Sequence, residues 1–109
     1  MLFCANDGAV MTAWRKDQKC NGDDSIINFY ADPTSTFTNA AGKLMMDHPG
    51  PISVGLLNRC KRFLLYIEDG TVKYSVTAED VDFDPAGDDF PEKVLPTQVI
   101  AAIKKMQQQ

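Results

Sequence analysis

Hydrophobic and polar positions are most clearly ordered between residues 58 and 74. The apolar run at residues 63–67 is too short for a typical helix. Its aromatic and β-branched residues, with turn signals on both sides, predict a strand buried on both faces. Residues 71–76 then alternate between apolar and polar side chains, which predicts a second strand nearer an edge. Gly70 lies between the two runs and can take the positive φ of a tight turn, so the segment predicts a β-hairpin.

The beginning of the chain predicts a strand followed by a helix. Residues 2–5 read as the strand, and Asn6 or Asp7 can cap the helix by accepting a hydrogen bond from a free backbone N–H. The apolar residues of the helix recur at helical spacing and predict its buried face: Val10, Met11 and Trp14. Residues 21–24 are rich in turn formers and predict a loop.

A second strand and a short helix are expected next. Residues 25–31 form the predicted strand, which Asp32-Pro33 ends because proline cannot donate to a sheet. A helix over residues 37–41 is expected to be ended by Gly42 and capped by a run of hydroxyl side chains: Thr34, Ser35 and Thr36.

The last part of the chain predicts an acidic loop and a helix. The loop covers residues 78–92, and Pro96 suits the first turn of the helix after it. The apolar stripe of this helix is expected to comprise Val99, Ile100, Ile103 and Met106. The order of strands and helices fits an α/β protein whose helices cover a mixed sheet.

Composition narrows the class of protein. A chain of 109 residues predicts one domain over residues 1–109, and a net charge of −4 argues against a nucleic-acid or membrane-surface role. No apolar run approaches the roughly 20 residues of a membrane span. The three cysteines have neither metal nor disulfide-framework spacing, so we expect reduced thiols and an intracellular, cytoplasmic location.

Metal and cofactor sites are not expected. His48 is the only histidine, which excludes a site built on several histidines. The acidic loop opens with calcium-loop spacing at Asp80, Asp82 and Asp84. Proline then occupies the turn position at Pro85 and the position of the bidentate acid at Pro91. The sequence therefore predicts a solvated loop and no cofactor.

Three collinear stretches resemble segments of one known family. The first is Lys61-Arg62-Phe63 followed by the acidic-Gly turn and Val72-Lys73. The second is Asn6-Asp7 followed by Val10-Met11 and Trp14, and the third is Tyr30-Ala31-Asp32-Pro33 with Phe37. Together they span most of the chain and are similar to the peroxiredoxins, in particular the type II or atypical two-cysteine branch.

The resemblance implies a fold, an activity and partners. It implies a truncated thioredoxin-like fold with a mixed sheet of about four strands flanked by helices. Members of the family reduce hydroperoxides with a cysteine in a Pro-x-x-x-Thr-x-x-Cys motif at a helix N-terminus, where the thiolate is stabilised. No cysteine of this chain has that motif, and we expect the motif to belong to preceding sequence. A thiol reductant such as thioredoxin or glutaredoxin is the expected redox partner.

Arg62 and Cys60 are the candidate catalytic residues. By resemblance, Arg62 occupies the place of the arginine that contacts the reacting cysteine and the peroxide. On an extended chain Cys60 would point to the same face as Arg62. Positive charge from Arg59 and Lys61 would lower the pKa of the Cys60 thiol. Cys4 and Cys20 rank below Cys60.

Two hypotheses of function follow. The first is a peroxiredoxin-like redox protein in which peroxide reduction is weak or absent, because the motif is missing. The second is a non-catalytic module that acts in dimerisation or partner binding. The family's central strand is missing too, which would leave unpaired edges on the strands at residues 2–5 and 63–67. We therefore expect a homodimer with residues 44–60 or an exposed strand edge at the interface.

Overall fold

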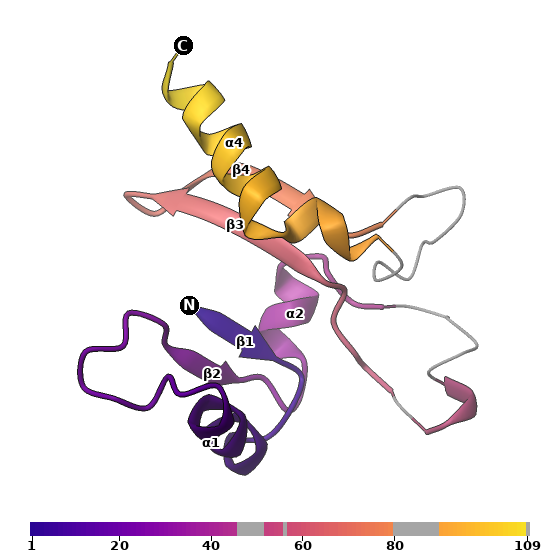
Figure 1. Cartoon of the computed structure of the whole chain (residues 1–109). Coiled ribbons are helices and arrows are strands. Elements are labelled where there is room, and N and C mark those ends of the chain that lie inside the picture. Colours follow the sequence, from indigo (N-terminus) through magenta and orange to yellow (C-terminus); the bar gives the residue numbers. More distant parts are fainter. Residues whose placement is uncertain (46–51, 56, 80–89, 109) are drawn as a thin grey trace. The chain divides into compact units, whose positions relative to one another are not determined.

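A computed structural model describes residues 1–45, 52–55, 57–79 and 90–108, and these residues form an α/β protein (Figure 1). The elements in chain order are β1 (Leu2–Cys4), α1 (Gly8–Asp17), β2 (Phe29–Ala31), α2 (Thr36–Ala40), β3 (Phe63–Glu68), β4 (Thr71–Thr77), the 3-10 helix η1 (Pro91–Val94) and α4 (Pro96–Gln107). They belong to two compact units. The first comprises Met1–Leu44 and Leu56–Cys60, and the second comprises Met45–Gly55 and Lys61–Gln109.

The first unit is built on a strand–helix–strand motif. β1 and β2 are parallel, with Phe3 opposite Tyr30, and α1 connects them. The predicted cap of α1 is confirmed, because the Asp7 carboxylate accepts a hydrogen bond from the backbone N–H of Val10 at 2.9 Å. Of the predicted buried face only Met11 is buried, at 3% exposure, whereas Val10 and Trp14 are exposed at 47% and 39%. The Trp14 ring still packs edge-on against Phe29 of β2.

The second strand is shorter than the sequence predicted. β2 begins at Phe29, whereas the predicted strand began at residue 25. The Ser25 hydroxyl accepts a hydrogen bond from the backbone N–H of Ile27 and donates to the Ile27 carbonyl. Local side-chain bonds of this kind compete with a strand ladder, which explains the later start.

The helix α2 is capped by a residue that the sequence did not indicate. Ser35 occupies the N-cap position with a left-handed φ of 56° and makes no capping bond there. The Asp32 carboxylate instead accepts from the backbone N–H groups of Phe37 and Thr38, and from the Thr38 hydroxyl at 2.6 Å. Capping by the three hydroxyl residues was therefore wrong, although Gly42 follows the helix with a φ of 69°, as expected.

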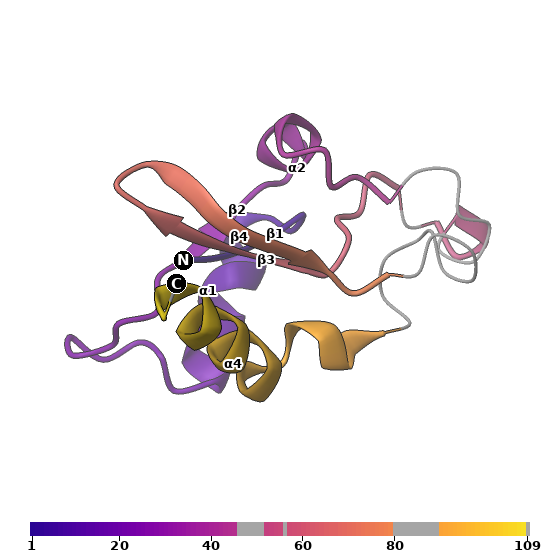
Figure 2. The same cartoon turned by 90° about the horizontal axis from the view of Figure 1, so that it is seen from above.

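The second unit contains the predicted hairpin. β3 and β4 are antiparallel, with Glu68 opposite Thr71, so the turn consists of two residues, Asp69 and Gly70. Both have positive φ, 50° and 75°, which is the backbone of a tight hairpin turn. Figures 1 and 2 show the two strands as long arrows joined at this turn.

The first strand of the hairpin is less buried than predicted. Residues of β3 are half-buried near its start and exposed near its end, where Ile67 is 50% exposed. Among the described strands, β3 pairs in a sheet with β4 alone. A two-stranded ribbon has too few neighbours to cover both of its faces, which explains the difference.

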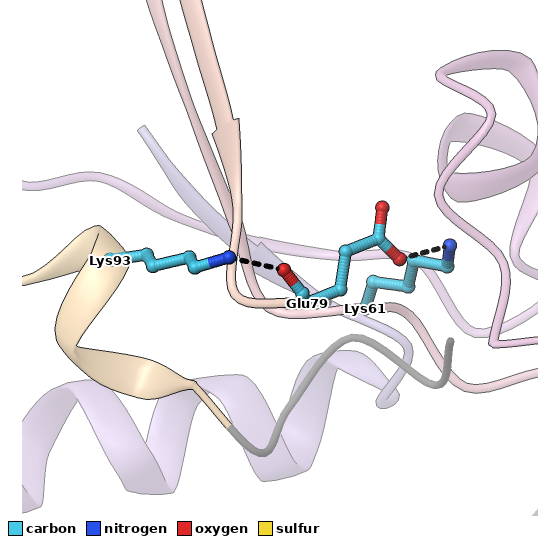
Figure 3. Close-up of polar contacts among 3 residues, drawn as sticks. All are labelled: Lys61, Glu79 and Lys93. Atoms are coloured by element: carbon cyan, nitrogen blue, oxygen red, sulfur yellow. Dashed lines mark hydrogen bonds and ion pairs between the residues drawn. The ribbon is translucent and has the colours of Figure 1, made fainter. Parts of the chain in front are cut away.

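Polar contacts close the open end of the hairpin. Lys61 precedes β3 and forms an ion pair with Glu79, which follows β4 (Figure 3). The Lys93 ammonium, from η1, donates to the backbone carbonyl of Glu79. Ala78, between β4 and Glu79, is fully buried, and its carbonyl accepts from the N–H of Phe90. These bonds tie η1 to the base of the hairpin.

The last helix begins at Pro96, as predicted. Val99 is buried, and Ile103 and Met106 are half-buried, so the apolar stripe is largely confirmed. Ile100 is exposed, contrary to the prediction. In a helix adjacent residues are separated by about 100° around the axis, which turns Ile100 away from the side of Val99.

Candidate functional site

Cys60 is the last residue of the second segment of the first unit, which lies far along the chain from the first segment. It forms an isolated antiparallel bridge with Leu44, and its side chain is half-buried. Two positions earlier, the backbone carbonyl of Asn58 accepts a hydrogen bond from the Ser35 hydroxyl. The segment is therefore fixed on both sides of Arg59 by bonds to the first unit.

The Arg59 side chain reaches the end of β1. Its guanidinium donates to the backbone carbonyl of Ala5 at 3.3 Å and to the side-chain oxygen of Asn6 at 3.4 Å. Both partners directly follow Cys4, the last residue of β1. Arg59 thus joins the segment that carries Cys60 to the segment that carries Cys4.

Asn6 connects this arginine to a sulfur atom. A guanidinium group can only donate hydrogen bonds, so the amide oxygen of Asn6 must be the atom that faces Arg59. The amide nitrogen is then directed at the Cys4 Sγ atom, 3.2 Å away. The result is a continuous chain of contacts from Arg59 through Asn6 to the Cys4 thiol.

The Cys60 thiol completes the cluster. The Cys4 thiol and the backbone N–H of Ala5 lie close enough to the Cys60 thiol to influence its ionisation. Burial and the neighbouring Cys4 raise the pKa of Cys60, and the Ala5 N–H and Arg59 oppose this more weakly. The expected lowering by nearby positive charge is therefore outweighed, and at neutral pH the Cys60 side chain is a neutral thiol.

The other predicted site residue belongs to the second unit. Arg62 is exposed, and its backbone carbonyl accepts a hydrogen bond from the N–H of Ala78. Lys61, whose charge was expected to act on Cys60, is paired with Glu79 at 2.7 Å. The pairing of Cys60 with Arg62, expected from their spacing on an extended chain, stays a prediction.

Cys20 stands apart from the thiol cluster. It follows α1, and its thiol donates to the backbone carbonyl of Gln18 at 3.5 Å. Its own carbonyl accepts from the Arg15 guanidinium. Its contacts are with the end of α1, whereas Cys4 precedes that helix, so Cys20 offers a control for experiments on the cluster.

An apolar hollow also lies in the first unit. Its volume is about 200 Å³, and its lining comprises Met1, Phe3, Tyr30, Ala31, Asp32 and Phe37. The Phe3 and Phe37 rings meet edge-on, with centroids 4.3 Å apart. The Asp32 carboxylate is bonded to the start of α2, so this hollow presents packing surface and no reactive group.

Metal ligands do not gather anywhere in the part of the chain that the structure describes. His48 and the calcium-like Asp80, Asp82 and Asp84 lie outside the described residues. None of the described helices is long and apolar enough to cross a membrane.

Sequence reasoning ranked Cys4 low and did not consider Asn6 as a site residue. The spacing of Cys4 and Cys60 along the chain gives no signal that the two thiols meet. The chain returns to the first unit before Cys60, and no pattern in the sequence indicates this return.

Comparison of the chain with models of protein families, with curated proteins and with solved structures found no match.

Proposed function

We propose that this chain is a peroxiredoxin-like redox protein in which thiol-dependent reduction of hydroperoxides is weak or absent. The observation that supports this proposal is that the Arg59 guanidinium links the residue before Cys60 to Ala5 and Asn6, the two residues after Cys4. In keeping with this placement, Cys4 raises the pKa of the Cys60 thiol. Paired thiols next to a fixed cation are suited to redox chemistry at sulfur.

The surroundings of the thiols explain why peroxide reduction would be weak. A thiolate is the nucleophile in such chemistry, and burial raises the pKa of Cys60. None of the three cysteines lies at a helix N-terminus, where the helix dipole would stabilise a thiolate. Cys4 ends β1, Cys20 follows α1, and Cys60 lies in an isolated bridge.

The thioredoxin-like arrangement belongs to the same proposal. Two features support it: parallel β1 and β2 connected by α1, and an antiparallel hairpin followed by α4. Both are building blocks of a mixed sheet flanked by helices.

A coupled peroxidase assay tests the activity, with thioredoxin or glutaredoxin as the reductant. We expect turnover of hydrogen peroxide far below that of a complete peroxiredoxin. Cys60→Ser should abolish any residual turnover, and the matched Cys20→Ser variant should not. Turnover equal to that of a complete peroxiredoxin would contradict the proposal, as would residual activity that depends on Cys20. Arg62→Met tests the role that the resemblance gives to Arg62, and we expect it to lower residual turnover.

A second candidate is a dimerising module, and exposed apolar side chains favour it. Val54 is 72% exposed and Leu57 is 64% exposed, and both lie within residues 44–60, the predicted interface. Light scattering at micromolar concentration should give the mass of a dimer, and Val54→Glu should reduce it to that of a monomer. A matched change at Ile26, which is also exposed but lies outside this range, should leave the mass unchanged. A wild-type monomer would refute the dimer.

A further inference from the structure

We propose that Cys4 and Cys60 are a thiol–disulfide couple that exchanges with small-molecule disulfides such as glutathione disulfide, with Cys4 reacting first and Cys60 second. This inference does not depend on peroxide reduction, because neither peroxide nor the missing cysteine motif takes part in it.

Independent contacts place the two cysteines close to each other. Arg59 bonds to Ala5 and Asn6, so the residue before Cys60 is attached to the two residues after Cys4. The bridge from Cys60 to Leu44 and the bond from Ser35 to Asn58 hold the second segment in the same unit. In keeping with this placement, Cys4 is close enough to Cys60 to raise the pKa of that thiol. A disulfide needs such proximity without large backbone movement.

The different surroundings of the two thiols determine the order in which they react. An N–H of Asn6 is directed at the Cys4 sulfur, and Arg59 fixes the orientation of that amide. Asn6 and Arg59 are therefore positioning residues for Cys4. Burial and Cys4 itself raise the pKa of Cys60, which keeps Cys60 protonated until its neighbour has reacted. A disulfide carries no charge, so Cys4 no longer opposes ionisation of Cys60 once it has reacted.

The exchange balances as follows. Cys4 loses its proton, and its sulfur attacks one sulfur of glutathione disulfide. A bond between Cys4 and glutathione forms while one glutathione thiolate leaves and takes up a proton. Cys60 then loses its proton and attacks the Cys4 sulfur, so the Cys4–Cys60 bond forms and the second glutathione leaves as a thiol. The protein gives up two electrons and two protons, and glutathione disulfide accepts them.

Cys20 provides the internal control. It lies beyond the end of α1, and a helix of 10 residues is about 15 Å long. A sulfur at that end of the helix, bonded to the Gln18 carbonyl, is not placed to form a disulfide with the cluster at the other end.

The experiment equilibrates the reduced full chain with mixtures of reduced and oxidised glutathione in the absence of peroxide. Thiols are then trapped with N-ethylmaleimide, and peptides are mapped by mass spectrometry. We expect one linkage, Cys4 to Cys60, with loss of two hydrogen atoms, while Cys20 is trapped as a free thiol. A linkage that includes Cys20, or a chain that keeps both Cys4 and Cys60 as thiols in oxidised buffer, would overturn the proposal.

Single variants test the order of reaction. Cys60→Ser should accumulate a glutathione adduct on Cys4, because the second step is blocked. In the Cys4→Ser variant only Cys60 of this pair can form the glutathione adduct. We expect that adduct to form at least several-fold more slowly than the Cys4 adduct of the Cys60→Ser variant. Equal rates would refute the order. Far-ultraviolet circular dichroism verifies that each variant folds. The linkage between Cys4 and Cys60 is measured in the wild-type chain, so that result does not depend on the folding of any variant.

Two further variants separate positioning from general structural support. Asn6→Ala should slow formation of the Cys4 adduct and change its pH profile, whereas Asn6→Ser keeps a short donor and should recover part of the rate. A pH profile unchanged in Asn6→Ala would remove Asn6 from the proposal.

Discussion

Lys61 and Glu79 form an ion pair that joins the two ends of the hairpin, with 2.7 Å between Nζ of the lysine and Oε2 of the glutamate. Both side chains are about one-fifth exposed, so the pair is shielded from water more than an ordinary surface pair. It lies opposite the turn, where the strands would otherwise separate first.

We therefore expect Lys61→Met and Glu79→Gln each to lower the free energy of unfolding by about 0.5–1 kcal/mol. Urea unfolding measures the loss, and a double-mutant cycle isolates the pair. The matched control is Lys104→Met on the exposed side of α4, which should have a smaller effect. A coupling energy indistinguishable from zero would show that the pair adds no stability.

Asp32 should make the stability of the chain depend on pH. Burial would raise the pKa of this carboxyl, but the hydrogen bonds from Thr38, Phe37 and Thr36 outweigh it and hold the pKa below its ordinary value of 3.8. The carboxylate therefore stabilises the folded state above the pKa of the unfolded chain. This contribution is lost as the pH falls through the lower folded value.

Asp32→Asn should accordingly cost about 1–3 kcal/mol near neutral pH, because the bonds to charged oxygen are weakened or lost. Urea unfolding should show a smaller difference between wild type and variant at acidic pH, below the ordinary value of 3.8. Thr38→Val removes one of the donors and should produce part of the effect. A loss that is equal at both pH values would contradict the role of the charge.

Cys60 should react slowly with iodoacetamide at neutral pH. Burial and Cys4 hold its pKa above the ordinary value of 9.0, so the rate should rise with a midpoint above that value. Cys4→Ser should lower the midpoint, because Cys4 raises the pKa of Cys60. Arg59→Met should raise the midpoint, because the charge of Arg59 lowers that pKa. Mass spectrometry of alkylated peptides measures each rate, and a midpoint below 9.0 in the wild type would contradict the burial of this thiol.

Gly70→Ala should cost about 1 kcal/mol of stability, because Gly70 has a φ of 75° that a residue with a Cβ adopts with strain. Apart from Gly70 and its two chain neighbours, no atom of the described residues lies within 4 Å of an added Cβ, so the cost is conformational and not steric. Gly70→Asn should lose less, since asparagine tolerates the left-handed region. Urea unfolding of the two variants checks the order, and an equal loss would exclude the conformational explanation.

The features predicted correctly from sequence depend on residues close to one another in the chain. Asp7 caps α1 three residues ahead, the turn at Asp69 and Gly70 joins adjacent strands, and Pro96 begins α4. The α/β class follows from the same local signals. One local signal was misleading. The residues from 25 onward predicted a strand, but Ser25 bonds to Ile27, and β2 begins only at Phe29.

The features that could not be predicted are an unusual local cap and contacts between segments that are distant in sequence. Asp32 captures the start of α2 because the chain bends after Pro33, and no capping pattern in the sequence indicates this. The meeting of Cys4 and Cys60 depends on the return of the chain to the first unit after residue 55. Arg59 was expected to act on Cys60 through its charge, but its bonds to Ala5 and Asn6 link segments far apart in the chain and have no signal in the sequence.

The first unit is discontinuous in sequence, and this has a consequence for the order of events during synthesis. Cys4 leaves the ribosome well before the second segment of the first unit, which ends at Cys60. Until that segment emerges, β1 lacks the Arg59 contacts and the Cys4 thiol is open to any oxidant or foreign thiol nearby. A ribosome that pauses before Cys60 is translated would therefore prolong the period in which the nascent chain forms wrong disulfides.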